Sequence, residues 1–366
     1  MVVVGARRES LNCRQRFTPA IYARMSRPLH ISLVAVPETS VSILLGLYDV
    51  LNSFQLLHGF SEIADVVPSP DMVPFNEEIV GATAGGPHLL AGGDRTLIHR
   101  GIAELDNTDI VIVSALIAEG RRWEKGRYPE MVSWLQSMYA RGAILASACS
   151  GILLLAETGL FDGRESTIHW SYSEFFRKLF PQVPLSPEQA LIVTGDRMQI
   201  ITSGAAASWH DLALYLIARQ VGPTAAQVVA KFFALQWHRD GLGAYMVFEG
   251  CSDHGDAAIL DAQTWLAKHF SVSDPVEEVI RRSGVAERTF NRRFSSATGH
   301  APLAYVQQLR VADAKRRLER TDEPVEEIGW RVGYEDPAFF RRLFKRLTGV
   351  TPGQYRRQFQ IPAYGR

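Results

Sequence analysis

"TFNRRFSSATG" (residues 289–299) and "FFRRLFKRLTG" (residues 339–349) are two copies of one pattern, 50 positions apart. Each copy carries two phenylalanines spaced by four residues and ends in Thr-Gly. A spacing of four places both rings on one face of an α-helix, and glycine is typical of the position just after a helix end. The two stretches therefore predict two similar helices, each with a buried aromatic pair.

The face opposite the aromatic pairs is polar and mostly cationic. It holds Asn291 and Arg292 in the first copy, with Arg288 directly before that copy, and Arg341, Arg342, Lys345 and Arg346 in the second. Arginine can bond guanine through two hydrogen bonds and asparagine can bond adenine in the same way. We expect Lys345 and Arg346 to lie nearer phosphates, where a contact adds salt-dependent affinity without sequence information.

The residues before each predicted helix repeat as well. "DPVEEVIRRSGV" (274–285) aligns with "EPVEEIGWRVGY" (323–334), so each copy offers a short helix, a turn with glycine and a second helix. This is the pattern of a helix-turn-helix unit. Asp336 is expected to cap the second helix of the second copy; we call the second helix of each copy, which carries the polar face, its reading helix. Residues 302–321 predict a connecting helix, which at about 1.5 Å per residue would hold the units about one DNA turn apart.

Charge is distributed unevenly although the net formal charge is zero. Residues 281–366 contain 18 Lys and Arg against 9 Asp and Glu, whereas residues 29–255 contain 14 against 24. This asymmetry indicates that the carboxyl-terminal end meets a polyanion and the rest of the chain does not.

The amino-terminal part alternates apolar strands with amphipathic helices. Strands are predicted at 30–36, 109–115 and 143–149, helices at 40–54, 128–142 and 150–159, and a hairpin at 191–201. Such alternation predicts a parallel sheet covered by helices on both faces. No apolar run is long enough for a membrane span, and cysteines at only 13, 149 and 251 argue for a reducing compartment without a disulfide framework.

"AILASACSGILLLAETG" (143–159) places Cys149 at a predicted strand-to-helix turn. Small residues on both sides permit the sharp turn that projects a nucleophile in hydrolases. The start of the following helix is expected to lower the pKa of the thiol. A lone cysteine after a strand is also a common core residue, so both interpretations stay open.

Residues 257–358 resemble the AraC/XylS-type DNA-binding domain over both helix-turn-helix units. The resemblance rests on "RRFSSATGHAPLAYV" (292–306), "RVADAKRRLERT" (310–321) and "IGWRVGYEDPAFFRRLFKRLTGVTPGQYRR" (328–357). It implies base-reading side chains at Arg288, Asn291, Arg292, Ala338, Arg341 and Arg342. Ala286 stands where the family prefers a Ser cap and Gly329 where it prefers Ala, and each departure should weaken a helix by up to about 1 kcal/mol.

Residues 30–236 resemble the PfpI/ThiJ group, which has the class I glutamine amidotransferase-like, flavodoxin-like fold. "ACSGILLLAETGLFDGRESTIHW" (148–170) matches that group's cysteine turn and its continuation. The resemblance implies a ligand site of Glu38, Cys149, Ser150 and His169. Ser150 occupies the position where peptidase-like members carry His, which argues against hydrolysis and leaves Cys149 as a candidate vestigial nucleophile. His169 either reaches the site or packs beside Trp170.

The sequence thus predicts an α/β domain followed by an all-α domain with two helix-turn-helix units. The predicted segments are a disordered basic tail (1–28), a PfpI/ThiJ-like sensing or dimerisation domain (29–236), a linker (237–256), the DNA-binding domain (257–358) and a carboxyl-terminal tail (359–366). We expect a cytoplasmic, homodimeric transcription factor rather than an enzyme. Its expected partners are double-stranded DNA, a small-molecule effector and, for an activator, RNA polymerase. A cysteine-dependent hydrolase or hydratase with an appended DNA-binding domain is the alternative, and no motif predicts a cofactor or a metal.

Overall fold

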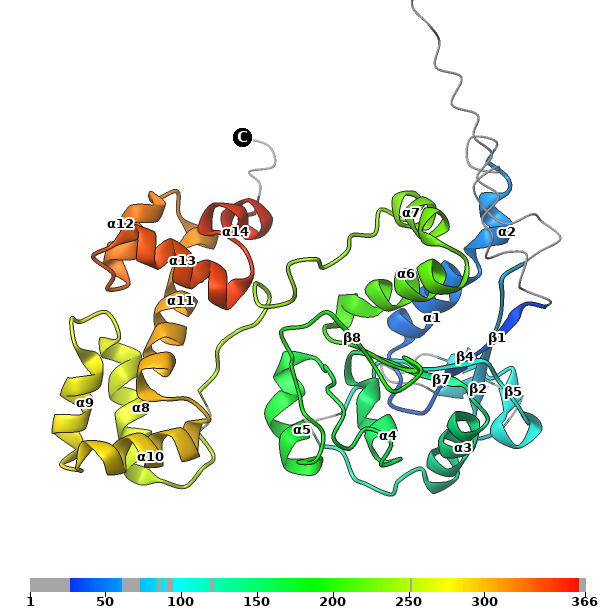
Figure 1. Cartoon of the computed structure of the whole chain (residues 1–366), viewed down its shortest axis with the longest axis horizontal. Coiled ribbons are helices and arrows are strands. Elements are labelled where there is room, and N and C mark those ends of the chain that lie inside the picture. The colour runs from blue at the N-terminus through cyan, green and yellow to red at the C-terminus, as the bar shows by residue number, and fades with distance from the viewer. Residues whose placement is uncertain are drawn as a thin grey trace, which may run out of the picture. The chain divides into compact units, whose positions relative to one another are not determined.

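A seven-stranded sheet forms the centre of the amino-terminal part of the chain (Figure 1). The computed structural model describes residues 27–60, 73–83, 87–89, 95–118, 122–250 and 252–361. In spatial order the strands are β5 (Arg100–Gly101), β2 (Phe75–Gly81), β1 (Leu29–Val34), β6 (Ile110–Val113), β7 (Ile144–Ala148), β9 (Ile200–Ser203) and β8 (Leu191–Thr194). All neighbouring pairs are parallel except β8 with β9.

Helices cover both faces of this sheet because its central strands are apolar on both sides. One face packs against α1 (Val41–Leu51), α2 (Ser53–Leu57), α6 (Trp209–Gln220) and α7 (Pro223–Phe232). The other face packs against α3 (Pro129–Ala140), α4 (Ile152–Ala156) and α5 (Ser173–Leu179). The predicted parallel α/β domain is therefore confirmed, including the hairpin turned at Gly195.

Two strands of the sheet were absent from the sequence prediction. These are β2 and the short β5, and β2 pairs with β1 along its length. A separate two-stranded antiparallel ribbon pairs β3 (Pro87–Leu89) with β4 (Arg95–Leu97). The predicted helix at 40–54 is in fact two helices, α1 and α2.

The carboxyl-terminal part consists only of helices where it is described. These are α8 (Ala257–His269), α9 (Pro275–Ser283), α10 (Glu287–Thr298), α11 (Pro302–Arg320), α12 (Val325–Arg331), α13 (Pro337–Thr348) and α14 (Pro352–Phe359). The two halves have separate cores that meet on α11: Tyr305 and Val306 belong to the first, and Val311 and Leu318 to the second. The predicted connecting helix is confirmed as α11.

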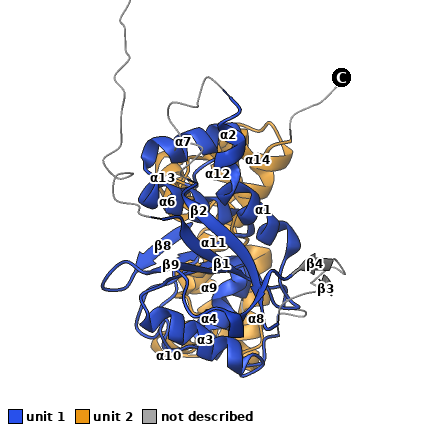
Figure 2. Ribbon diagram, turned by 90° about the vertical axis from the view of Figure 1, so that its right-hand side faces the viewer, with its two compact units in different colours: residues 1–238 blue, residues 239–366 orange. Residues whose placement is uncertain are grey.

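The chain divides into two units, residues 1–238 and 239–366 (Figure 2). The segment predicted as a linker is shared between them. His238 is held in the first unit, where its backbone N–H and Nδ1 lie 2.9 and 2.6 Å from the buried Asp211 carboxylate. Residues 239–250 belong to the second unit, where Lys315 Nζ donates to the carbonyl oxygens of Gly243 and Met246 at 2.8 and 2.9 Å.

Both predicted tails lie mostly outside the described residues. At the amino-terminal end only residues 27 and 28 of the predicted tail are described, and the Arg27 guanidinium makes two bonds of 2.7 and 2.8 Å to Asp109. At the other end, residues 362–366 are outside, as are Cys13 and Cys251.

Candidate nucleic-acid interface and ligand cavity

The first helix-turn-helix unit is built from α9 and α10. Pro275 starts α9, and Gly284 ends it with a left-handed φ of 64°, a conformation that glycine adopts without steric cost. Phe290 and Phe294 are buried on one face of α10. The sequence-based assignment of this turn and this buried face is confirmed.

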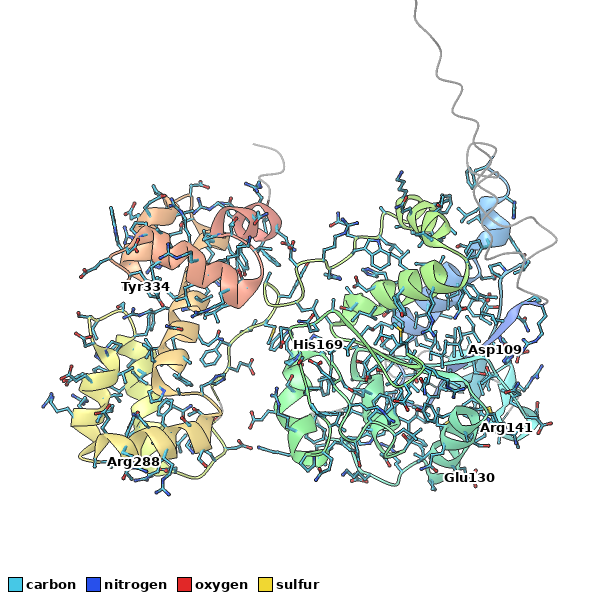
Figure 3. The ribbon with its side chains drawn as sticks, viewed as in Figure 1. Asp109, Glu130, Arg141, His169, Arg288 and Tyr334 are labelled. Atoms are coloured by element: carbon cyan, nitrogen blue, oxygen red, sulfur yellow. The ribbon has the colours of Figure 1, made fainter. Side chains whose placement is uncertain are left out.

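The opposite face of α10 is open to solvent. Arg288 and Arg292 are exposed, and Asn291 between them is half-buried. Neither arginine has an ion pair or hydrogen bond with another residue in the described part of the chain. Figure 3 shows Arg288 at the surface of the carboxyl-terminal helical unit (residues 239–366). Arg293, one position on, is different, because its guanidinium binds Asp256 at 2.7 and 2.9 Å and so ties α10 to the start of α8.

The second unit of this kind is built from α12 and α13. The Asp336 carboxylate accepts a hydrogen bond of 2.7 Å from the Ala338 N–H, which confirms the expected cap. Gly329 on α12 faces the ring of Phe340, and a Cβ there would stand 3.1 Å from that ring. The glycine that appeared to weaken α12 thus allows a close approach of the two helices.

The exposed face of α13 carries Ala338, Arg341, Arg342, Lys345 and Arg346. Three of its cations have partners within the second unit. Arg341 forms an ion pair with Glu326 on α12, and Arg342 lies 3.9 Å from Asp336. Arg346 donates to the Gln307 side chain at 3.3 Å. This face is therefore as accessible as that of α10 but more strongly tied to its neighbours.

Equivalent aromatic contacts hold both reading helices on α11 and α14. The ring of Phe294 meets Tyr305 edge-on at 5.2 Å, and Phe344 meets Tyr355 in the same way at 5.5 Å. Thr298 and Thr348, each followed by a left-handed glycine, donate their hydroxyl groups to the carbonyls of the preceding Phe at 2.7 and 2.8 Å. The duplication in sequence is thus a duplication in packing.

In the amino-terminal α/β unit (residues 1–238), Cys149 lies at the strand-to-helix turn as predicted. Its φ of 56° is the left-handed conformation of a sharp turn. The side chain is only 5% exposed, and burial raises the pKa of the thiol to about 11. The expectation of a lowered pKa was wrong, because loss of solvation outweighs the short helix α4 that follows.

Ser150 and Glu38 are committed to other partners. The Ser150 hydroxyl donates to the Leu116 carbonyl at 2.6 Å and accepts from the Leu116 N–H at 2.9 Å. The Glu38 carboxylate accepts from the Tyr128 hydroxyl at 2.5 Å and pairs with Arg127. Burial and the carboxylate raise the pKa of Tyr128. Glu38 therefore supports the start of α3 and makes no hydrogen bond to Cys149 within the described part of the chain.

His169 has a local structural contact. Its Nδ1 lies 2.8 Å from the Ser171 hydroxyl and accepts from the Ser171 N–H, which caps the turn Trp170–Tyr172. Its ring packs against Trp170 at 5.2 Å. These contacts favour packing, the second of the two interpretations given for this residue. Its position is labelled in Figure 3.

A cavity of about 600 Å³ opens beside Arg127 and Tyr128. It lies outside the carboxyl ends of β1 and β2, the edge where ligands of open parallel sheets commonly bind. Its walls come from residues 35–37, 81–83 and 127–131 together with Ile98 and Ile102. This cavity was not predicted from the sequence, because β2, which forms part of its wall, was not predicted.

In the described ranges no three His, Cys, Asp or Glu side chains come together as a metal site would need. Nor does any helix in those ranges have the length and apolar character required to cross a bilayer.

Comparisons with known proteins agree with this architecture. Residues 279–358 match a family model described as a helix-turn-helix domain. The HTH-type transcriptional regulator CdhR of Pseudomonas aeruginosa is 27% identical over 85% of this chain and 92% of its own length. The HTH-type transcriptional regulator GlxA of Rhizobium meliloti is 27% identical over 61% of this chain and 68% of its own length.

A solved structure is also similar to part of the chain. The AraC family transcriptional regulator from Pseudomonas putida matches 56% of this chain and all of that structure's chain, with 20% identity and a TM-score of 0.44. The matched model and these relatives show that the carboxyl-terminal unit is a helix-turn-helix domain similar to that of HTH-type transcriptional regulators, and the topology described above adds a mostly parallel α/β domain ahead of it.

Proposed function

We propose that this chain regulates transcription by inserting α10 and α13 into two successive major-groove segments of double-stranded DNA. The observation that carries this proposal is the repeated unit: two helices with the same buried aromatic contacts, both with exposed basic faces, joined through α11. With 19 residues, α11 is about 28 Å long at 1.5 Å per residue. That length is comparable with one turn of DNA, about 34 Å.

The exposed side chains would divide into two roles. Base edges in one segment would be read by Arg288, Asn291 and Arg292 on α10. Base edges in the next segment would be read by Ala338, Arg341 and Arg342 on α13. Lys345 and Arg346 would contact phosphates. Because phosphate contacts release counterions, affinity should fall steeply as salt concentration rises.

A mobility-shift titration with the DNA upstream of this reading frame, and with a scrambled duplex, tests the proposal. The double variant Arg288→Ala/Arg292→Ala should lose the preference for the upstream DNA, and Arg316→Ala, an exposed arginine on α11, serves as the control. Equal affinity of the wild type for both duplexes at physiological salt would overturn sequence-specific regulation.

We further propose that the first unit binds a small-molecule effector in the cavity beside Arg127 and Tyr128. Such an effector alters regulation only if it binds two arrangements of the protein with different affinity. Met131 lines the cavity, and Met131→Trp would occupy part of its volume. This variant should then abolish the response of a reporter gene to the effector while DNA binding persists. The regulator would act in the cytoplasm as a homodimer and, as an activator, would also contact RNA polymerase.

The enzyme alternative has weaker support. A nucleophilic thiol needs a lowered pKa or an adjacent base, whereas Cys149 is buried with a raised pKa and its neighbour Ser150 is bonded to Leu116. We infer that Cys149 packs the core at this turn. Cys149→Ala should leave reporter regulation intact, and turnover that disappears in this variant would instead favour the enzyme.

A further inference from the structure

One carboxyl group in the first unit is buried without a full set of partners. In β2, Phe75, Glu77 and Ile79 alternate toward the helices α1 and α2, so Glu77 stands in an otherwise apolar row. The residue is only 8% exposed, and its Oε2 has no hydrogen-bond partner in the described part of the chain. An unpaired buried carboxylate is costly, so a group that persists in this state calls for an explanation.

The neighbouring carboxyl group shows the difference. Glu78 points to the other face of the sheet, where its oxygens lie 3.0 Å from His30 Nε2 and 3.0 Å from the Arg100 guanidinium. Two adjacent residues of one strand therefore carry the same group, but only Glu78 has a basic side chain as its partner among the described residues. The solvation lost at Glu77 raises its pKa to about 7.

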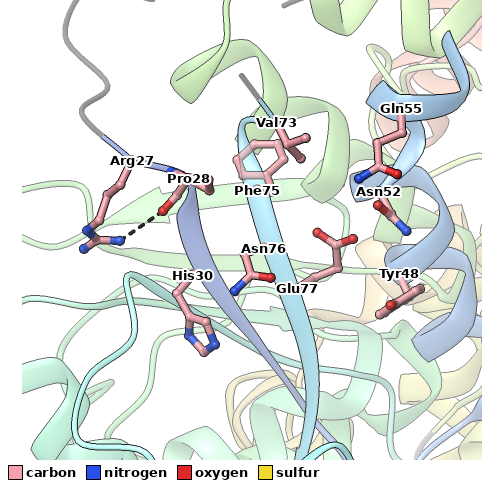
Figure 4. Close-up of a pocket in the computed structure, with 10 residues that line it drawn as sticks. All are labelled: Arg27, Pro28, His30, Tyr48, Asn52, Gln55, Val73, Phe75, Asn76 and Glu77. Atoms are coloured by element: carbon pink, nitrogen blue, oxygen red, sulfur yellow. Dashed lines mark hydrogen bonds between the residues drawn. The ribbon is translucent and has the colours of Figure 1, made fainter. Parts of the chain in front are cut away.

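A cavity of about 510 Å³ adjoins Glu77. It opens at the amino ends of β1 and β2, the edge opposite to the cavity beside Tyr128. Figure 4 shows the Glu77 side chain extending from β2 toward Tyr48 of α1, Gln55 of α2 and Asn52 between these helices. Its volume falls in the range of about 300 to 1,000 Å³ that is usual for small-molecule sites.

The lining groups select the kind of ligand. Glu77 supplies negative charge, and the side-chain amides of Asn52 and Gln55 supply acceptor oxygens. Tyr48 adds an aromatic ring, whose face attracts cations. Among the described residues that line this cavity, the Lys or Arg side chain is that of Arg27, and it is already paired with Asp109, so it offers little to an anionic ligand. A metal ion would need several more oxygen or nitrogen ligands than one carboxylate provides.

We propose that this cavity binds a small organic cation that carries an ammonium group, with Glu77 as its counter-ion and Asn52 and Gln55 as further acceptors. The site is separate from the DNA-reading helices and from the effector cavity proposed above. It gives the buried carboxylate the partner that β2 and the helices do not supply.

The experiment uses the full chain with n-butylammonium as the probe and n-butanol as an uncharged probe of the same length. Titration calorimetry and thermal unfolding are performed at pH 8, where Glu77 is ionised. We expect butylammonium to bind the wild type and raise its Tm, and butanol at the same concentration to have no comparable effect. Glu77→Gln should weaken butylammonium binding by about tenfold or more, the effect of losing a hydrogen bond to a charged group.

Glu78→Gln is the matched control, because it removes the same charge one residue away, on the opposite face. It should bind butylammonium as the wild type does. Equal effects of butylammonium and butanol on the wild type, or equal butylammonium affinity in Glu77→Gln, would overturn the proposal. The first comparison needs no variant, so the test holds even if Glu77→Gln fails to fold. DNA binding is measured in parallel and is expected to be unchanged, which keeps this test independent of the regulatory function.

Discussion

The two helix-turn-helix units differ in how they hold their exposed cations. On α10, Arg288 and Arg292 have no ion pair with any other described residue, whereas on α13 Arg341 is paired with Glu326. Arg346 and Arg342 also have neighbours, Gln307 and Asp336. The buried contacts of the two units, by contrast, are nearly the same. The core of the repeat has been kept while its reading face has changed.

This difference has a physical consequence for binding. An exposed ion pair contributes about 0 to 1 kcal/mol, so a side chain that leaves one to contact DNA loses part of what it gains. The free arginines of α10 have no such loss. We therefore expect each arginine of α10 to contribute more free energy to DNA binding than each arginine of α13, although α13 carries more positive charge.

The largest effects should come from the shared core. Phe294→Ala and Phe344→Ala each remove a fully buried ring and should cost about 3 to 5 kcal/mol. Because the two cores are separate, hydrogen exchange should rise mainly in α9 and α10 for the first variant and in α12 and α13 for the second. Leu303→Ala, at an exposed position on α11, is the control. Uniform loss of protection in both variants would show that the two units are one cooperative body.

The reading faces give the next effect in size. Arg288→Ala should weaken binding to the specific DNA by about 1 to 3 kcal/mol, the cost of a lost base contact. For Arg341→Ala the loss of binding free energy should be smaller by up to about 1 kcal/mol. In the wild type, Arg341 gives up its ion pair with Glu326 when it contacts DNA, so its net contribution to binding is smaller. Affinities measured at one salt concentration for both variants test this order. A larger loss for Arg341→Ala would reverse the comparison.

Much of this architecture could be predicted from local sequence. The helix ends of the repeat follow from Gly284, Gly299, Gly349 and the Asp336 cap, which act within a few residues. β2 escaped prediction because Glu77 and Glu78 interrupt its apolar run, and the burial of Glu77 depends on helices that lie elsewhere in the sequence. A strand that breaks the local pattern in this way often marks a functional or strained site.

The candidate site of the first unit was predicted less well. The resemblance implied Glu38 as a ligand-site residue, but its partners Arg127 and Tyr128 lie about ninety positions away and no local signal connects them. The pKa of Cys149 was predicted in the wrong direction because burial depends on the whole fold, while the expected helix effect comes from only five residues of α4.

The helix caps provide a smaller test of the same comparison. Asp336→Ala removes the side-chain cap of α13 and should destabilise the second unit by about 1 kcal/mol. Ala286 precedes α10 in an extended conformation without a side-chain cap, so Ala286→Ser should stabilise the first unit by up to a similar amount. Hydrogen exchange measured at increasing denaturant concentration, in each helix-turn-helix unit separately, gives the stability change for both variants. The prediction fails if Ala286→Ser leaves α10 unchanged.

Gly329 should give the smallest effect, because two terms oppose each other. Alanine is favoured over glycine inside a helix by about 1 kcal/mol, but its Cβ would stand 3.1 Å from the ring of Phe340. Phe340 is fully buried between Tyr334 and Phe344 and cannot easily move away. We therefore expect Gly329→Ala to lower the Tm by no more than a few degrees rather than raise it. A clear rise in Tm would show that α12 and α13 have room to separate, and that the close approach in the second unit is not required.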